Sequence, residues 1–303
     1  MSDVDSRSTV GTWLEAGSVT TYSYRTTVAG VSAGTAAGFA VGTPDPSLRD
    51  IVLRYEGFTV SGGGPAIFRE VACTYVPIII DLDQGWSVSH REHVGSAPLR
   101  LTSFVAGLTD GPVLVGHGGS ARCLQVDLTP LGARRILGLP LAELANRSVS
   151  IEAVLGRDGA DLVQRIVDAA TWQERFSIVD AALVRRLHDA VDLDAEVAWS
   201  LERIVASSGN LAIGRLATEL GWSHRKLIAR YRDAVGLPPK VVARIVRFES
   251  VCTRLRGGAG LAVAAAECGY FDQAHLSREV RDLAGITPAE LQRTVNSVQD
   301  PAV

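Results

Sequence analysis

The sequence predicts an α+β fold in which a small β-barrel with a helical hairpin precedes an all-helical C-terminal region. Residues 48–130 contain short apolar runs that are separated by turn residues, a pattern typical of strands in a small barrel or sandwich. Beyond Pro130, apolar residues recur every three or four positions, as they do on amphipathic helices. The chain of 303 residues is long enough for two domains of about 100–200 residues each.

Changes in composition along the chain predict four segments. The first is rich in Gly, Ser, Thr and Ala, and we expect it to be an irregular arm with one strand at residues 19–27. The β-rich segment follows, then a helical hairpin that acts as a linker, then the C-terminal helices. The expected boundaries are 1–47 for the arm, 48–160 for the β-rich domain, 161–194 for the linker and 195–303 for the C-terminal domain.

Within the β-rich segment the expected strands are residues 51–58, 74–82, 99–108 and 122–128. The last one alternates most clearly, because Leu124, Val126 and Leu128 lie on one face. Gln125 and Asp127 lie on the opposite face.

Composition excludes several classes of protein. Apolar residues make up 47% of the chain and charged residues 21%, which excludes global disorder. We find no uncharged apolar run near the ~18–20 residues of a spanning helix, and no signal peptide, so we expect a cytoplasmic protein without a membrane partner. The four cysteines are scattered and form no Cys-x-x-Cys pair, which argues against a disulfide framework or a zinc ribbon.

The formal net charge of −3 conceals an asymmetry. Residues 1–194 carry 16 basic and 22 acidic side chains, whereas residues 195–303 carry 14 and 11. Residues 223–256 alone carry nine basic side chains and two acidic ones. An acidic half joined to a basic half favours a polyanionic partner for the C-terminal region, although a solvated basic helix face is the alternative.

The C-terminal region repeats itself at an offset of 49 residues. Gly236-Leu237-Pro238-Pro239 corresponds to Gly285-Ile286-Thr287-Pro288, and Leu227 corresponds to Leu276. Each copy has a short helix, a glycine-containing turn, a capping residue (Ser223 or Asp272) and a second helix that ends at the repeated glycine. This order predicts two helix-turn-helix units, whose second helices enter the major groove of DNA.

Residues 239–256 predict a long helix that holds the two units apart. The stretch 211–291, notably residues 265–278 followed by Gly285-Ile286-Thr287-Pro288, resembles the AraC/XylS family of bacterial transcription regulators. The resemblance implies a double helix-turn-helix domain and double-stranded promoter DNA as the partner. It also implies RNA polymerase as a partner if the protein is an activator, and it leaves open a homodimer and a small-molecule effector.

By that resemblance, base contacts come from the exposed starts of the two second helices, while Lys226 and Arg230 contact phosphates. For Arg278 the alternative is a salt bridge with Glu279 or Asp282, and for Gln273 it is a capping role at the helix start. The expected DNA-binding residues are Ser223, Arg225, Lys226, Ile228, Ala229, Arg230, Asp272, Gln273, Ala274, His275 and Arg278.

The order of strands, the segment 124–133 and the helical hairpin is similar to the cupin-like sensor domains that are fused to AraC-type regulators. Those domains bind effectors or dimerise. The mouth of a β-barrel is a common ligand site, and aromatic side chains could line it here, although core packing is the alternative for each of them. The candidate effector-binding residues are Tyr55, Phe68, Tyr75, Trp86 and Phe104.

The resulting hypothesis is an effector-responsive, sequence-specific DNA-binding transcription regulator of the AraC type that is not an enzyme and needs no cofactor. The alternative is a cupin-type metalloenzyme fused to a DNA-binding module, in which His90, His93 and His117 would be the ligands. A Gly-x-Ser-x-Gly match at residues 30–34 lies in the arm rather than in a strand-to-helix turn, so we assign no catalytic or metal-binding residue. The stripe Phe176, Val179, Leu183 and Leu187 could pack on a second copy or within one chain.

Overall fold

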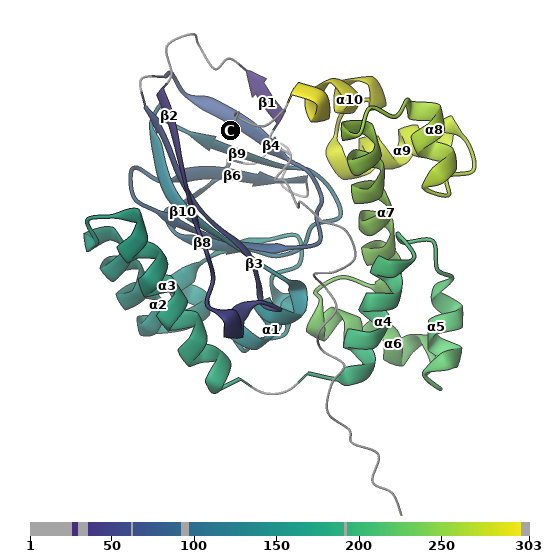
Figure 1. Ribbon diagram of the computed structural model, residues 1–303, viewed down its shortest axis with the longest axis horizontal. Helices are drawn as coiled ribbons and strands as arrows, with labels where there is room; N and C mark the ends of the chain where they lie inside the picture. Colours follow the sequence, from purple (N-terminus) through teal and green to yellow (C-terminus); the bar gives the residue numbers. More distant parts are fainter. Residues whose placement is uncertain (1–25, 30–35, 62, 92–96, 191–192, 298–303) are drawn as a thin grey trace, which may run out of the picture.

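The computed structural model describes residues 26–29, 36–61, 63–91, 97–190 and 193–297, and Figure 1 shows strands in the N-terminal half beside a column of C-terminal helices. The strands are β1 (Thr26–Ala29), β2 (Ala36–Gly42), β3 (Val52–Ser61), β4 (Ala66–Glu70), β5 (Val76–Asp81), β6 (Trp86–His90), β7 (Leu99–Leu101), β8 (Phe104–Ala106), β9 (Val113–His117), β10 (Ala121–Leu128) and β11 (Ser148–Ser150). The helices are α1 (Pro130–Leu137), α2 (Ile151–Asp168), α3 (Trp172–His188), α4 (Ala195–Ala206), α5 (Ile213–Glu219), α6 (His224–Ala234), α7 (Pro239–Arg256), α8 (Leu261–Glu267), α9 (Gln273–Ala284) and α10 (Pro288–Ser297), with short 3₁₀ helices η1 (Pro46–Leu48) and η3 (Leu141–Glu143).

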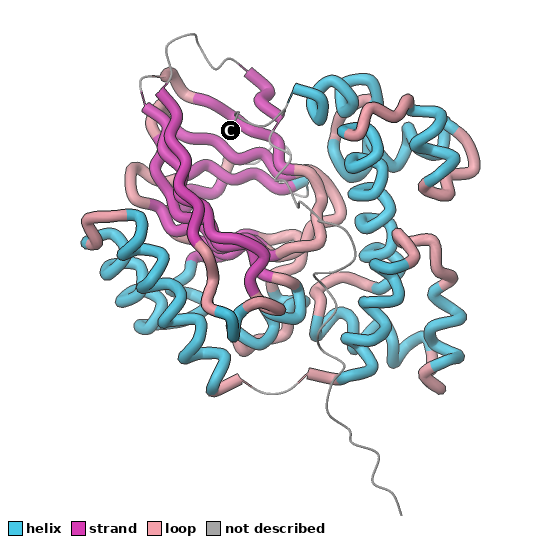
Figure 2. The backbone as a smooth tube through the Cα atoms, viewed as in Figure 1, coloured by secondary structure: helices cyan, strands magenta, loops and turns pink. Residues whose placement is uncertain are grey.

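The strands form two antiparallel sheets. The five-stranded sheet has the order β1-β4-β9-β6-β7, and the six-stranded sheet has the order β11-β8-β5-β10-β3-β2. Among the described residues the two sheets share no strand, so the expected small barrel or sandwich takes the form of two separate sheets. Figure 2 shows the strands as one magenta block and the C-terminal region as helices joined by loops, which confirms the α+β class.

Part of the expected irregular arm is regular structure. Residues 36–42 form β2, the edge strand of the six-stranded sheet, which pairs with β3 from Ala36↔Ser61 to Gly42↔Tyr55. The unpaired backbone groups at the edge of β3 give this segment its hydrogen-bond partners in spite of its small side chains. A glycine is required at position 42, because a Cβ there would lie 2.6 Å from the ring of Phe176 on α3.

The two faces of the six-stranded sheet have different neighbours. Leu124, Val126 and Leu128 belong to the large apolar core that includes α1, α2 and α3. Gln125 and Asp127 point to the other face and are also buried. The Gln125 amide donates a hydrogen bond of 2.8 Å to Asp127, and burial raises the pKa of Asp127 against the opposing charge of Arg54. The polar face of this strand is therefore enclosed rather than solvated.

The hairpin of α2 and α3 packs on the six-stranded sheet. Phe176, Val179 and Leu183 are buried in the shared core, and the ring of Phe176 stacks on Tyr55 at 6.1 Å. A capping box between Thr171 and Glu174 starts α3. Of the two interpretations of the α3 stripe, the structure shows packing within one chain.

The two repeated units are α5 with α6 and α8 with α9, and α7 lies between them (Figure 1). The Ser223 hydroxyl accepts a hydrogen bond from Lys226 N at 3.2 Å, and Asp272 accepts one from His275 N at 2.6 Å, so both residues cap their helices. Gly285, which ends α9, has φ of +67°, a left-handed conformation that favours glycine.

The β-rich domain contacts helix α6 of the first repeated unit and the connecting helix α7. Arg134 on α1 pairs with Asp233 on α6 at 3.2 Å. The segment between β4 and β5 contacts α7, where Thr74 donates from its amide and its hydroxyl to Glu249, both at 2.8 Å. Burial in this seam raises the pKa of Glu249 to about 7. The two regions therefore share a polar seam beside a continuous apolar core.

Replacing Glu249 with Gln should change how stability depends on pH. Because the folded-state pKa is raised to about 7, the contribution of Glu249 to the free energy of unfolding should be largest below about pH 4.3, the ordinary value for Glu, and fall as the pH rises to 7. This loss should be on the order of 2–3 kcal/mol, and Glu249→Gln should remove it.

Urea unfolding between pH 5 and 8 measures this difference. The exposed Glu202 on α4 provides the matched control, since Glu202→Gln should keep the pH slope of the native protein. Equal slopes for Glu249→Gln and the native protein would contradict the assigned burial.

Candidate functional site

The two recognition helices α6 and α9 bury one side and expose the other. On α6 the buried stripe is Leu227, Tyr231 and Ala234, and on α9 it includes Leu276 and Val280. Nearly all the residues expected to contact DNA lie outside these stripes. Those exposed are Ser223, Arg225, Lys226, Ala229, Arg230, Asp272, Gln273, Ala274 and Arg278, while Ile228 and His275 are half-buried.

The cations on α6 differ in their surroundings. The Lys226 ammonium lies 4.2 Å from the centroid of the Trp222 ring, and Arg230 pairs with Asp194 at 3.1 Å. Arg225 makes no ion pair within the described part of the chain. Arg230, expected to contact phosphate, would first have to leave Asp194, so Arg225 and Lys226 are the more accessible cations.

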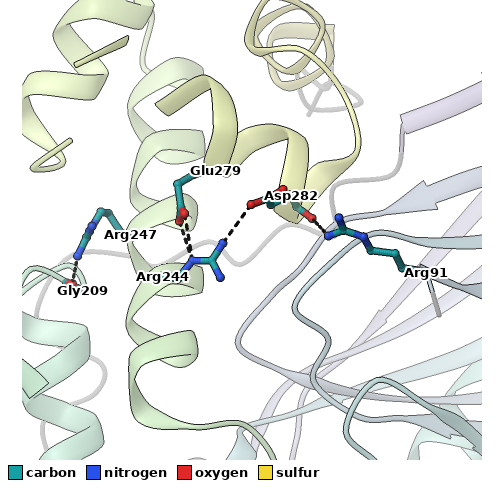
Figure 3. A network of polar contacts seen from close by, with 6 residues as sticks. All are labelled: Arg91, Gly209, Arg244, Arg247, Glu279 and Asp282. Atoms are coloured by element: carbon teal, nitrogen blue, oxygen red, sulfur yellow. Dashed lines mark hydrogen bonds and ion pairs between the residues drawn. The ribbon is translucent and has the colours of Figure 1, made fainter. Parts of the chain in front are cut away.

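On α9, the acidic neighbours of Arg278 are bound by another residue. Figure 3 shows Arg244 of α7 between Glu279 and Asp282, at 3.0 Å and 3.6 Å. Arg278 is exposed and has no ion pair with any described residue. The structure therefore provides no support for the salt-bridge alternative, and the Arg278 guanidinium can reach an external partner.

Other side chains at the start of α9 serve the turn. Asp272 holds the cap, so the capping role considered for Gln273 belongs to Asp272. The His275 ring accepts a hydrogen bond from Phe271 N at 3.4 Å and packs edge-on to Tyr270 at 5.1 Å. Ser223 and Asp272, expected among the DNA-binding residues, thus use their side chains to fix the helix starts.

Phe271 is a surface residue that the sequence analysis missed. It directly precedes the Asp272 cap and is 93% exposed, whereas the neighbouring Tyr270 is buried. Tyr270 and Phe271 are adjacent aromatic residues in one turn and point in different directions. This aromatic pair is the sequence signal that could have identified an exposed ring here. The position of Phe271 places an apolar ring beside the exposed start of α9.

A cavity of about 80 Å³ lies among residues of both sheets. Four of the five aromatic candidates line it: Phe68 on β4, Tyr75, Trp86 on β6 and Phe104 on β8. The remaining lining residues are Glu70, Val71, Cys73, Pro77, Ile79, Ala106, Gly107, Thr109, Val113, Val115, Cys123, Gln125 and Ser148.

Tyr55 does not line the cavity, so its proposed role there is wrong. Its hydroxyl donates a hydrogen bond of 2.8 Å to Asp180 on α3, and its ring stacks on Phe176. Burial raises the pKa of Tyr55 far above its ordinary value. Because it pairs in register with Val126, Tyr55 shares the face of the six-stranded sheet that the helices cover.

The histidines considered as metal ligands have other partners. His90 Nε2 lies 3.0 Å from the Ser148 hydroxyl, and His117 Nδ1 accepts a hydrogen bond of 3.2 Å from Gly119 N. His93 lies outside the described residues. Within the described ranges no group of three His, Cys, Asp or Glu side chains is placed to hold a metal ion, and no helix is long and apolar enough to span a bilayer.

Comparison with known proteins identifies the C-terminal fold. Residues 216–294 match a helix-turn-helix domain family, which confirms the expected AraC-type fold of this region. No curated protein matches the chain.

Three solved structures show a distant likeness. ToxT from Vibrio cholerae strain SCE256, in a structure with a bound unsaturated fatty acid, is 11% identical over 82% of this chain and 98% of its own, with a TM-score of 0.47. The AraC-like transcriptional activator CuxR is 11% identical over 65% of this chain and 80% of its own, with a TM-score of 0.26. A protein assigned to ethanolamine utilization from Salmonella typhimurium LT2 is 14% identical over 31% and 69%, with a TM-score of 0.21.

Replacing Arg278 with Ala should remove sequence preference without affecting the fold. An arginine can donate two parallel hydrogen bonds to O6 and N7 of guanine, and such a pair contributes ~1–3 kcal/mol of discrimination. We therefore expect the ratio of cognate to scrambled affinity to fall roughly 5- to 150-fold, while the melting temperature stays the same because Arg278 has no partner in the fold.

Fluorescence anisotropy with cognate and scrambled duplexes at one salt concentration measures this ratio. Arg100→Ala, at an exposed arginine on β7, removes the same charge away from the recognition helices and should leave the ratio unchanged. An equal loss of affinity for both duplexes would make Arg278 a phosphate contact.

Proposed function

Because residues 216–294 form an AraC-type helix-turn-helix domain, we propose that this chain is a sequence-specific DNA-binding transcription regulator. The observation that carries the proposal is the pair of recognition helices, each with an exposed start bearing free or nearly free cations. Arg225 and Lys226 supply them on α6, and Arg278 supplies one on α9. Positive side chains at these positions suit the phosphates and guanine edges of duplex DNA.

The two recognition helices are held on one rigid support. Figure 3 shows that Arg244 binds α9 through Glu279, while Arg247 of the same helix donates a hydrogen bond of 2.7 Å to the carbonyl of Gly209, beyond α4. At 1.5 Å per residue, α7 is about 27 Å long. Such a support suits two contacts on one face of a duplex, in successive major grooves.

We assign different roles in DNA recognition to α6 and α9. On α6, Lys226 and Arg225 face outward beside the small Ala229 and the half-buried Ile228, which suits phosphate contacts and apolar contact with thymine methyl groups. On α9, Gln273 and Arg278 offer hydrogen bonds to base edges. In this proposal α9 contributes most of the hydrogen-bonded sequence recognition.

The N-terminal region takes the sensing role in this proposal. Its aromatic cavity, which Trp86 and Phe104 line, supports a small-molecule effector, because ligand pockets are typically lined by aromatic and apolar side chains with a few polar groups. Two further partners stay predictions. They are RNA polymerase, if the protein is an activator, and a second copy of the chain in a homodimer.

Selection of bound duplexes from a random pool tests the function. We expect the native protein to enrich a bipartite site, and insertion of about 5 base pairs, half a helical turn, between its two parts should abolish most of the specific affinity. The reason is that α7 fixes both units, so the second half-site would move to the opposite face of the DNA.

Insertion of a full turn of about 10 base pairs is the matched control for sequence disruption. A bipartite site that tolerates the 5-base-pair insertion would show that the units bind independently. Failure to enrich any sequence would overturn the proposed function.

A further inference from the structure

The two helix-turn-helix units differ in the turn that precedes the recognition helix. In each unit the aromatic residue after the turn glycine donates its amide to the carbonyl five residues earlier, at 2.9 Å. This residue is Trp222 in the first unit and Tyr270 in the second. Ser223 caps α6 directly after Trp222, whereas Phe271 separates Tyr270 from the cap of α9. The second turn is therefore one residue longer, and Phe271 is the additional residue.

Trp222 and Tyr270 also have corresponding side-chain contacts, which supports this alignment of the two turns. The Lys226 ammonium lies 4.2 Å from the centroid of the Trp222 ring, and the His275 ring packs edge-on to Tyr270 at 5.1 Å. Lys226 and His275 are each the third residue of their recognition helix. The aromatic residue after the glycine thus packs on the same helix position in both units. Phe271 has no counterpart in the first unit.

The Phe271 ring is presented to solvent from a fixed turn. It is 93% exposed, the largest value among the large apolar side chains that the structure describes, and it belongs to neither apolar cluster of the described residues. Its backbone is nevertheless held, because its amide donates to His275 Nδ1 at 3.4 Å. The next residue, Asp272, accepts a hydrogen bond of 2.6 Å from His275 N. The fold therefore fixes the position of Phe271 without using its ring.

The ring extends the surface that the proposed function assigns to DNA. Phe271 directly precedes the cap of α9, and Gln273, Ala274 and Arg278 of that helix are exposed. A recognition helix in the major groove contacts base edges with its N-terminal residues. Because Arg278 has no ion pair with any described residue, the surface around the ring attracts a polyanion. This continuity favours DNA over a protein as the partner of the ring.

The chemistry of the major groove limits what an apolar ring can recognise there. Guanine and adenine present hydrogen-bonding groups, cytosine presents an amino group, and thymine presents a methyl group beside its carbonyl oxygen. A phenyl ring is a poor partner for the hydrogen-bonding groups, since covering them would remove them from water without replacing their bonds. The thymine 5-methyl group gains from such burial. An apolar ring at this position therefore selects thymine.

We propose that Phe271 is a further base-reading residue, whose ring contacts the 5-methyl group of a thymine at the end of the α9 half-site where the helix begins. This inference rests on the proposed function, since it adds one contact to the DNA-binding surface. Gln273 and Arg278 recognise bases by hydrogen bonds, and Phe271 adds apolar discrimination. The longer turn places this ring ahead of the helix start, so the second unit reads one position that the first unit does not.

Deoxyuridine substitution tests the proposal, because it removes the 5-methyl group of thymine and keeps the base pair. The α9 half-site of the selected duplex is the part in which Arg278→Ala relaxes the base preference. Each thymine in it is replaced singly, and anisotropy measures the affinity of the native protein, Phe271→Ala and Phe39→Ala. Phe39 is the matched control, because it is a 58% exposed phenylalanine on β2, across the molecule from α9 (Figure 1).

For the native protein and Phe39→Ala we expect deoxyuridine at one position to lower the affinity about fourfold, the effect of leaving one methyl group unburied. Phe271→Ala should bind the thymine duplex about 3- to 10-fold more weakly than the native protein. It should not distinguish thymine from deoxyuridine at that position. Its melting temperature should equal that of the native protein, because the Phe271 ring is outside the apolar clusters.

Equal affinity of the native protein for the thymine and deoxyuridine duplexes would overturn the proposal, and so would a deoxyuridine effect that persists in Phe271→Ala. Unchanged DNA affinity in Phe271→Ala would assign the ring to a protein partner instead. A selected α9 half-site without thymine would also contradict the assignment. These outcomes require that the native protein selects a sequence. If it selects none, the proposed function is wrong and this inference falls with it.

Discussion

The burial of α7 is the constraint on which the rest of this structure depends. Val242, Ile245 and Phe248 lie in the core with essentially no exposed surface, so the helix cannot rotate or shift without opening that core. The polar residues between them are therefore held in fixed positions. Arg244 pairs with α9, Arg247 is hydrogen-bonded to the loop after α4, and Glu249 is hydrogen-bonded to the β-rich region. One helix therefore contacts α9, the loop after α4 and the β-rich region.

The six-stranded sheet provides the second constraint, because both of its faces are covered. Its helix-covered face is apolar, and this gives the large core that continues into the C-terminal region. Its other face carries Gln125 and Asp127, which are hydrogen-bonded to each other, and Asp127 also pairs with Arg54 Nε in a shielded environment. Polar groups that are removed from water need such partners. The space between the sheets therefore combines aromatic packing with a few hydrogen-bonding groups, the mixture on which small-molecule recognition depends.

The interface between the two regions joins these constraints. A purely apolar seam would tolerate small shifts, whereas the bonds from Thr74 to Glu249 and from Ala72 to Leu283 are directional. The apolar core keeps the two regions together, and these bonds define their relative register. Residues 71–75, three of which line the cavity, are therefore hydrogen-bonded directly to α7 and α9.

Local sequence predicted the features that local chemistry controls. The repeated capping residues Ser223 and Asp272 and the glycine at the end of each second helix act within a few residues, so the two helix-turn-helix units could be recognised without a structure. The buried and exposed faces of α6 and α9 followed from helical periodicity alone. The alternation in β10 predicted its two faces, but not that both would be buried.

Tertiary structure decided the features that depend on residues far apart in the chain. Tyr55 and Phe68 are both aromatic residues on strands, yet only the strand register puts Tyr55 under α3 and Phe68 in the cavity. Arg230 and Arg278 are both basic residues on recognition helices, yet Asp194 binds the first, while Arg244 occupies the acidic neighbours of the second. Composition and periodicity determined the classes of element and the exposed faces of α6 and α9. Long-range contacts decided which side chains can contact an external partner. A charged or aromatic side chain can do so only when no residue distant in the sequence packs on it or pairs with it.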